Sequence, residues 1–126
     1  MTEIRGEADV RSISAAIGTE EPTARRLVRA AIRSQVDVQE LAWISSIVWA
    51  KVRLLREGSE EVVSAFSRCG LSVVQLPGND CGLHLIRIAV SLNAIPDASM
   101  RSVCALELAG RRRGRELLLI AANLEP

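Results

Sequence analysis

The stretch Asp9–Arg33, DVRSISAAIGTEEPTARRLVRAAIR, predicts two amphipathic helices joined by a tight turn. The first runs over Glu7–Ile17, where apolar residues recur at helical spacing, and Gly18 is a fitting residue just past its end. The second runs over Glu21–Ser34, with Pro22 suited to its first turn. Four basic residues fall within an arc of about 100° opposite its apolar face. They are Arg25, Arg26, Arg29 and Arg33.

The segment Ile13–Arg29, ISAAIGTEEPTARRLVR, resembles the helix–turn–helix of many bacterial DNA-binding proteins. Gly18 matches the turn glycine, Pro22-Thr23 the start of the recognition helix, and Leu27 its inward position. The resemblance implies that this helix enters the major groove and contacts bases or phosphates. The contacts would come from Thr23, Arg25, Arg26, Arg29 and Arg33. Alternatively, these arginines form the solvated face of an amphipathic helix.

A third helix is predicted from a capping box at Asp37 and Glu40 as far as Glu57, with Gly58 ending it. It carries two apolar stripes, one with Leu41, Ile44, Val48, Val52 and Leu55, the other with Trp43, Ile47, Ala50 and Leu54. A helix that is apolar on two sides is central in the fold or shared with a second subunit. We therefore expect a homodimer or a protein partner. The expected interface residues are Trp43, Ile47, Trp49 and Leu54.

A fourth helix over Glu60–Cys69 is capped by Ser59, and after Gly70 the pattern changes. Apolar runs of strand length predict a β-meander within residues 71–124, with a hairpin tip at Gly110-Arg-Arg-Arg-Gly114. The three arginines are either a solvated loop tip or a contact for phosphates or an acidic partner. The runs are Leu71–Leu76, Leu83–Leu92, Val103–Ala109 and Glu116–Ala122. The predicted fold is one α+β domain over residues 1–126, four helices in residues 7–70 followed by a small antiparallel sheet. The abundance of Ala, Leu, Glu and Arg leaves an all-α fold as the alternative.

Composition excludes several classes of protein. The formal net charge is +1, so any nucleic-acid contact depends on a local patch, and the aromatic residues are too few for stacking on single strands. Three unpatterned cysteines and one histidine do not predict a zinc site or another cofactor. No secretory signal or membrane-spanning run is visible, which predicts a cytoplasmic protein without membrane contact.

One segment suggests an enzyme. Gln75–Gly82, QLPGNDCG, is similar to the nucleophile segment of the SUMO-type cysteine proteases, which has Gln six positions before the Cys. That family also needs a His upstream of the Cys, and the one histidine, His84, follows Cys81. A thiol without a base is a poor nucleophile. The sequence therefore predicts no catalytic residues.

The resulting functional prediction is a small regulatory protein that binds DNA through an N-terminal helix–turn–helix. The alternative is a regulator or adaptor that binds another protein through an apolar helix or a sheet edge, without DNA contact.

Overall fold

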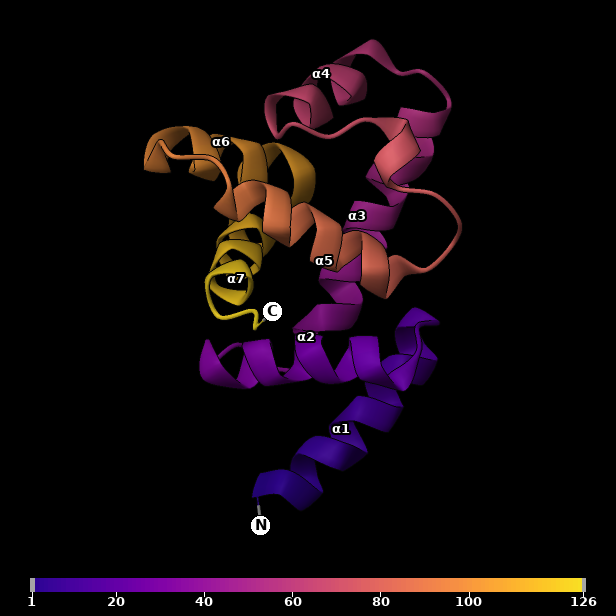
Figure 1. The fold of residues 1–126 in the computed structure, drawn as a ribbon, viewed down its shortest axis with the longest axis vertical. Helices are drawn as coiled ribbons and strands as arrows, with labels where there is room; N and C mark the ends of the chain where they lie inside the picture. Colours follow the sequence, from indigo (N-terminus) through magenta and orange to yellow (C-terminus); the bar gives the residue numbers. More distant parts are fainter. Residues whose placement is uncertain (1, 126) are drawn as a thin grey trace.

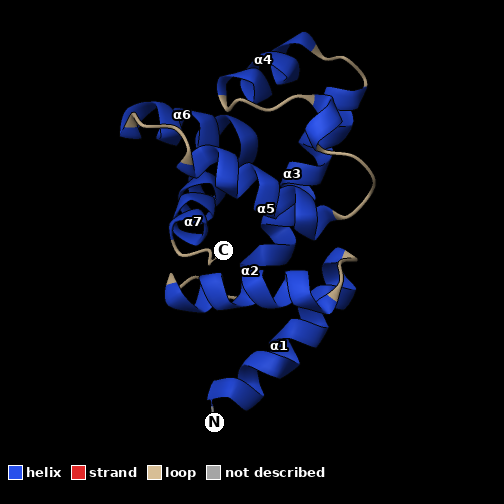
Figure 2. Ribbon diagram, viewed as in Figure 1, coloured by secondary structure: helices blue, strands red, loops and turns tan. Residues whose placement is uncertain are grey.

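The computed structural model describes residues 2–125, and Figure 1 shows their fold. Its elements are α1 (Thr2–Ile17), α2 (Glu21–Arg33), α3 (Glu40–Arg56), α4 (Glu60–Arg68), the 3₁₀ turn η1 (Val73–Gln75), α5 (Cys81–Asn93), α6 (Ala98–Ala109) and α7 (Arg111–Ala122). Residues 2–125 contain no strand, as Figure 2 shows. The predicted α+β fold with an antiparallel sheet in residues 71–124 is therefore wrong, and the all-α alternative is correct.

The run Leu83–Leu92, predicted as a strand, lies within α5. Its β-branched residues alternate along the sequence, but its burial follows the helical period: Leu85, Ile88 and Leu92 are fully buried, whereas Val90 is 55% exposed. A strand would have placed Ile88 and Val90 on one face. The misleading alternation arose because α5 is apolar on most of its circumference, so that periodicity alone did not distinguish a buried helix from a strand.

The predicted hairpin tip at residues 110–114 is instead the junction of two helices. Gly110 ends α6 and precedes α7, with a φ of +81° that favours glycine. Gly114 lies inside α7, where a Cβ atom would stand 2.7 Å from the carbonyl oxygen of Ala105. The two glycines therefore turn the chain and let the backbones of α6 and α7 touch.

The first four helices follow the predicted order, and their ends lie close to the predicted ones except that α1 begins at Thr2. The capping box predicted for α3 is wrong. The carboxylate of Asp37 accepts a hydrogen bond from the backbone N–H of Gln39 at 2.9 Å, and α3 begins at Glu40. The Glu40 side chain reaches α7 instead and pairs with Arg112 and Arg113 at 3.0 and 3.1 Å.

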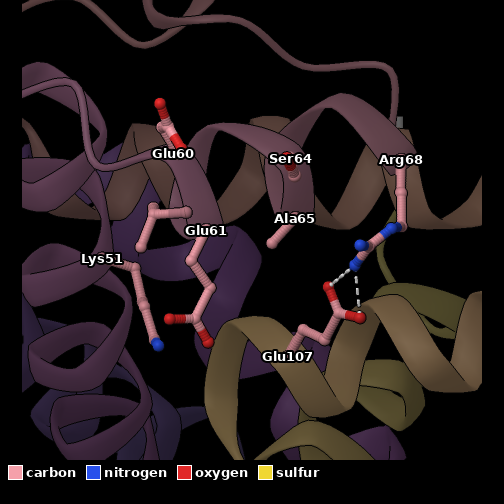
Figure 3. Close-up of a pocket in the computed structure, with 8 residues that line it drawn as sticks. Lys51, Glu60, Glu61, Ser64, Ala65, Arg68 and Glu107 are labelled. Atoms are coloured by element: carbon pink, nitrogen blue, oxygen red, sulfur yellow. Dashed lines mark hydrogen bonds and ion pairs between the residues drawn. The ribbon is translucent and has the colours of Figure 1, made fainter.

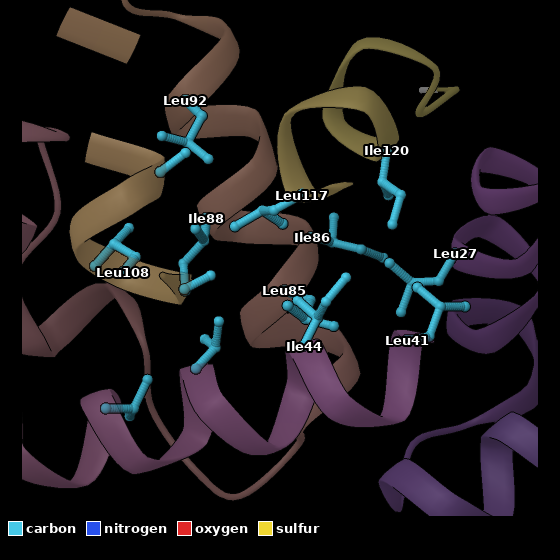
Figure 4. Packing of buried hydrophobic residues seen from close by; sticks show 14 of the residues in the cluster. Leu27, Leu41, Ile44, Leu85, Ile86, Ile88, Leu92, Leu108, Leu117 and Ile120 are labelled. Atoms are coloured by element: carbon cyan, nitrogen blue, oxygen red, sulfur yellow. The ribbon is translucent and has the colours of Figure 1, made fainter. Parts of the chain in front are cut away.

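The buried apolar side chains form one cluster to which all seven described helices contribute. Figure 4 shows its centre, where Ile44 of α3 and Leu85 and Ile88 of α5 lie among Leu108 of α6 and Leu117 of α7. The helix α5 crosses the middle of the molecule in Figure 1, while α1 extends away from the body beneath α2. The helix α3, the longest of the described helices, contacts all six others, and α5 lies against α2, α3, α6 and α7.

The turn between α1 and α2 is anchored to the start of α5. The Thr19 hydroxyl donates to Oδ1 of Asp80 at 2.6 Å, and the same oxygen caps α5 by accepting from the backbone N–H of Leu83 at 3.0 Å. The Ser14 hydroxyl donates to the Thr19 carbonyl at 2.6 Å. Gly82 leaves the space that the Thr19 side chain fills. This contact fixes the N-terminal helix pair on the body of the fold.

Candidate functional site

The predicted DNA-contacting residues lie on α2, but most of their guanidinium groups already have partners. Arg25 forms a salt bridge with Glu7 of α1 at 2.9 Å, and this hydrogen-bonded pairing lowers the pKa of the Glu7 carboxyl. Arg26 donates to the backbone carbonyl of Glu125 at 2.9 Å. Thr23 is half-buried. Two of the predicted contacts are thus turned towards the protein's own oxygen atoms.

The end of α2 is joined to α7 and to the segment that follows it. Arg33 pairs with the Glu125 carboxylate at 2.5 Å, and the Ser34 hydroxyl donates to the carbonyl of Leu119 at 2.9 Å. Arg29 is exposed and forms no salt bridge or hydrogen bond with the described part of the chain. The structure therefore keeps the predicted residues on one helix, and of their four arginines Arg29 is the one without a partner in residues 2–125.

The predicted protein interface is divided between two sides of α3. Trp43 is 61% exposed and Leu54 is 39% exposed, with Ile47 half-buried and Ala50 exposed between them. These four residues, here called the α3 stripe, stand at i, i+4, i+7 and i+11 on one solvent-facing side. They extend over about 16 Å of helix. The stripe lies opposite the buried face that carries Ile44 and Leu55.

Trp49, the other predicted interface residue, lies away from this stripe and packs within the protein. Its indole stacks on the imidazole of His84, with ring centroids 5.8 Å apart and planes 12° from parallel. The guanidinium carbon of Arg56 lies 5.2 Å from the Trp49 ring centroid. His84 is buried, and its Nε2 lies 2.9 Å from the carbonyl oxygen of Pro77. These contacts connect α3 to the loop before α5.

No hydrogen bond joins the side chains of Cys81 and His84 in the described residues. Cys81 is half-buried at the first position of α5, and its Sγ lies 3.7 Å from the carbonyl oxygen of Asn79. The His84 imidazole contacts Pro77 instead. Burial raises the pKa of the Cys81 thiol, which disfavours the nucleophilic thiolate.

A charged pocket opens between α3, α4 and α6 (Figure 3). Lys51 and Glu61 extend into it from α3 and α4, and Arg68 forms an ion pair with Glu107 at its other side. Charges of both signs line the pocket, so it selects neither an anion nor a cation.

Among residues 2–125 no group of three or more His, Cys, Asp or Glu side chains is placed to hold a metal ion. No described helix has the length and apolar character needed to cross a membrane.

A second hollow, which the sequence did not predict, lies between α6 and α7. Leucines and arginines line most of it, with one carboxylate among them; the lining residues are Ser102, Leu106, Arg111, Arg112, Gly114, Arg115, Glu116 and Leu118. The run of arginines was visible in the sequence, but the leucines were assigned to strands. Helical spacing of Ser102 with Leu106, and of Arg111 with Arg115 and Leu118, could have placed these lining residues on one face of each helix.

Comparisons with known proteins add no relative. The chain matches no protein-family model, no curated protein and no solved structure.

Proposed function

We propose that this chain is a cytoplasmic protein-binding regulator or adaptor, that it acts by binding and not by catalysis, and that the α3 stripe holds a second copy of it. The observation that carries the proposal is the 61% exposure of Trp43 in line with Ile47, Ala50 and Leu54 on one face of α3. Tryptophan is enriched among residues that dominate protein interfaces.

The stripe has a substantial driving force for association. A tryptophan side chain buries about 150–250 Å², and at about 25 cal/mol per Å² the exposed part of Trp43 contributes roughly 3 kcal/mol on burial. Ile47 and Leu54 add smaller amounts. A stripe about 16 Å long makes a small interface, so we expect micromolar association and not an obligate dimer.

The spacing of the stripe favours a second copy as the occupant. The intervals between its residues are four, three and four, which read the same in both directions. Two antiparallel α3 helices related by a two-fold axis would therefore bring Trp43 against Leu54 of the other copy, and Ile47 against its Ala50, twice over. Such self-complementarity is what an isologous interface requires.

DNA contact through α2 has less support. Arg25, Arg26 and Arg33 bind oxygen atoms of the same chain, and a recognition helix needs its arginines free to meet bases and phosphates. Glu7 also places a carboxylate beside that face. Catalysis at Cys81 lacks a neighbouring base.

Sedimentation equilibrium over about 1–300 µM tests the proposed dimer. We expect wild type to shift from monomer to dimer and Trp43→Ser to remain monomeric. Val74→Ser is the matched control, because Val74 is 79% exposed and lies outside the stripe. Wild type that stays monomeric, or Trp43→Ser that dimerises equally well, would refute the proposal.

Fluorescence gives a second measurement of the same contact. Trp43 and Trp49 are the two tryptophans of the chain, so emission from Trp49→Phe protein comes from Trp43 alone. Dimer formation should move that emission to shorter wavelength as the concentration rises.

The remaining DNA prediction is checked by anisotropy of labelled duplex DNA at low ionic strength: binding that Arg29→Ala weakens would restore the helix–turn–helix hypothesis.

A further inference from the structure

The hollow between α6 and α7, here called the α6–α7 groove, has an apolar part and a basic rim. It encloses about 690 Å³. Leu106, which is 44% exposed, and half-buried Leu118 supply the apolar part. Arg111 and Arg115 are exposed at the rim, on the first turns of α7. The two kinds of side chain line one continuous depression.

The rim carries more positive charge than the protein itself neutralises. Glu40 is shared by Arg112 and Arg113 at 3.0 and 3.1 Å, yet the Arg112 side chain stays 71% exposed. The one carboxylate of the lining, Glu116, pairs with Arg113 at 3.7 Å, and Arg111 and Arg115 form no ion pair with any described residue. Positive side chains are also unfavourable at a helix N-terminus, where the helix dipole is itself positive. An anionic partner would offset both the mutual repulsion of the arginines and their repulsion by the positive end of the helix dipole.

The two leucines of the groove indicate that the partner also has apolar side chains. A nucleic-acid backbone or a free phosphate would contact the arginines but would leave Leu106 and Leu118 uncovered. An amphipathic protein segment uses both, because its apolar side chains cover the leucines while its carboxylates meet the guanidinium groups in bidentate pairs. The absence of a side chain at Gly114 keeps α6 and α7 in contact, which holds the two halves of the groove at a fixed separation.

We propose that the α6–α7 groove binds an acidic amphipathic segment of another protein. This inference rests on the proposed function in treating the chain as a protein-binding module, but it uses residues separate from the α3 stripe. In this proposal the α3 stripe binds a second copy of the chain, and the α6–α7 groove binds the other protein. Leu106 and Leu118 bind the apolar side of the segment, and Arg111, Arg112 and Arg115 bind its carboxylates.

The probe is a displayed library of random peptides of about 15 residues, the length of a short docking helix. It is selected in parallel on wild type and on Trp43→Ser protein, which lacks the centre of the α3 stripe. We expect both selections to enrich peptides that combine Asp or Glu with Leu. Enrichment on Trp43→Ser protein shows that the groove works even if the dimer proposal fails. Selections that yield no acidic, leucine-containing peptides would overturn the groove proposal.

A selected peptide is then titrated by fluorescence anisotropy. Arg111→Glu/Arg115→Glu and Leu106→Ser should each weaken its binding at least about tenfold. The control Arg29→Glu/Arg53→Glu reverses two exposed charges elsewhere and should stay within about twofold. Circular dichroism checks the fold, and α7 should tolerate glutamates near its N-terminus. Unchanged binding by Leu106→Ser, or equal competition by polyphosphate, would reduce the groove to a general anion site and refute the proposal.

Discussion

The contact between Thr19 and Gly82 makes a quantitative prediction about stability. A Cβ atom at position 82 would lie 2.6, 2.7 and 2.8 Å from Oγ1, Cβ and Cγ2 of Thr19. Thr19 is buried and is held by hydrogen bonds to Ser14 and Asp80, so it has little freedom to move. We therefore expect Gly82→Ala to destabilise the protein, although alanine is normally the better residue in a helix.

The magnitude follows from three contributions. Overpacking costs about 1–3 kcal/mol, and displacing the Thr19 hydroxyl from the Asp80 carboxylate adds about 1.5 kcal/mol. The higher helix propensity of alanine returns at most about 1 kcal/mol. The net expectation is a loss of about 1.5–3.5 kcal/mol, which lowers the Tm by about 10 °C for a chain of this size.

Urea unfolding followed by circular dichroism measures the effect, and a double-mutant cycle assigns it. Thr19→Gly removes all three atoms that the new methyl group would meet. The double variant Thr19→Gly/Gly82→Ala should therefore lose less stability than the two single variants together, by about 1 kcal/mol or more. If Gly82→Ala is as stable as wild type, or if the two effects add within about 0.5 kcal/mol, the steric argument is wrong.

Three further predictions concern the core and the helix contacts. Gly114→Ala should destabilise by about 1–3 kcal/mol in urea unfolding, and Ala105→Gly should not rescue it, because the clash is with backbone atoms of residue 105. Phe66→Ala removes a fully buried side chain of α4 and should cost about 3–5 kcal/mol by the same measurement. Burial, with the neighbouring Cys104 thiol, raises the pKa of Cys69 from 9.0 to about 12, so the unfolded state loses this proton first and stability should fall as pH rises from about 9 to 12. The slope of unfolding free energy against pH should be smaller in Cys69→Ala, and equal slopes would contradict the assignment.

The first half of the fold was predictable because its signals are local. Glycines at positions 18, 58 and 70 follow the ends of α1, α3 and α4, and each helix between them has a regular apolar period. The capping box at Asp37 failed because Glu40 found stronger partners on α7. Glu40 and Arg112 are 72 positions apart, so this pairing cannot be recognised from the sequence around residue 40.

The second half was mispredicted for a different reason. In α5 nearly every side has an apolar residue, and a continuous apolar run fits a buried helix as well as a strand. The abundance of residues with high helix propensity favoured helices, and helices are what the structure contains. The candidate site shows the same division. Exposure of Trp43 and Leu54 follows from helical period, whereas the stacking of Trp49 on His84 depends on how α3 and α5 meet.

The junction between α2 and α7 has a consequence for how the chain folds. The hydrogen bond from Ser34 to Leu119 joins residues 85 positions apart, and the salt bridge from Arg33 to Glu125 closes a similar loop. A helical protein built mostly from neighbouring contacts folds quickly, but this loop must close before α2 gains its last partners. An intermediate that lacks α7 and the segment after it therefore leaves Arg26 and Arg33 without their partner Glu125, whereas Arg25 keeps its salt bridge to Glu7 of α1.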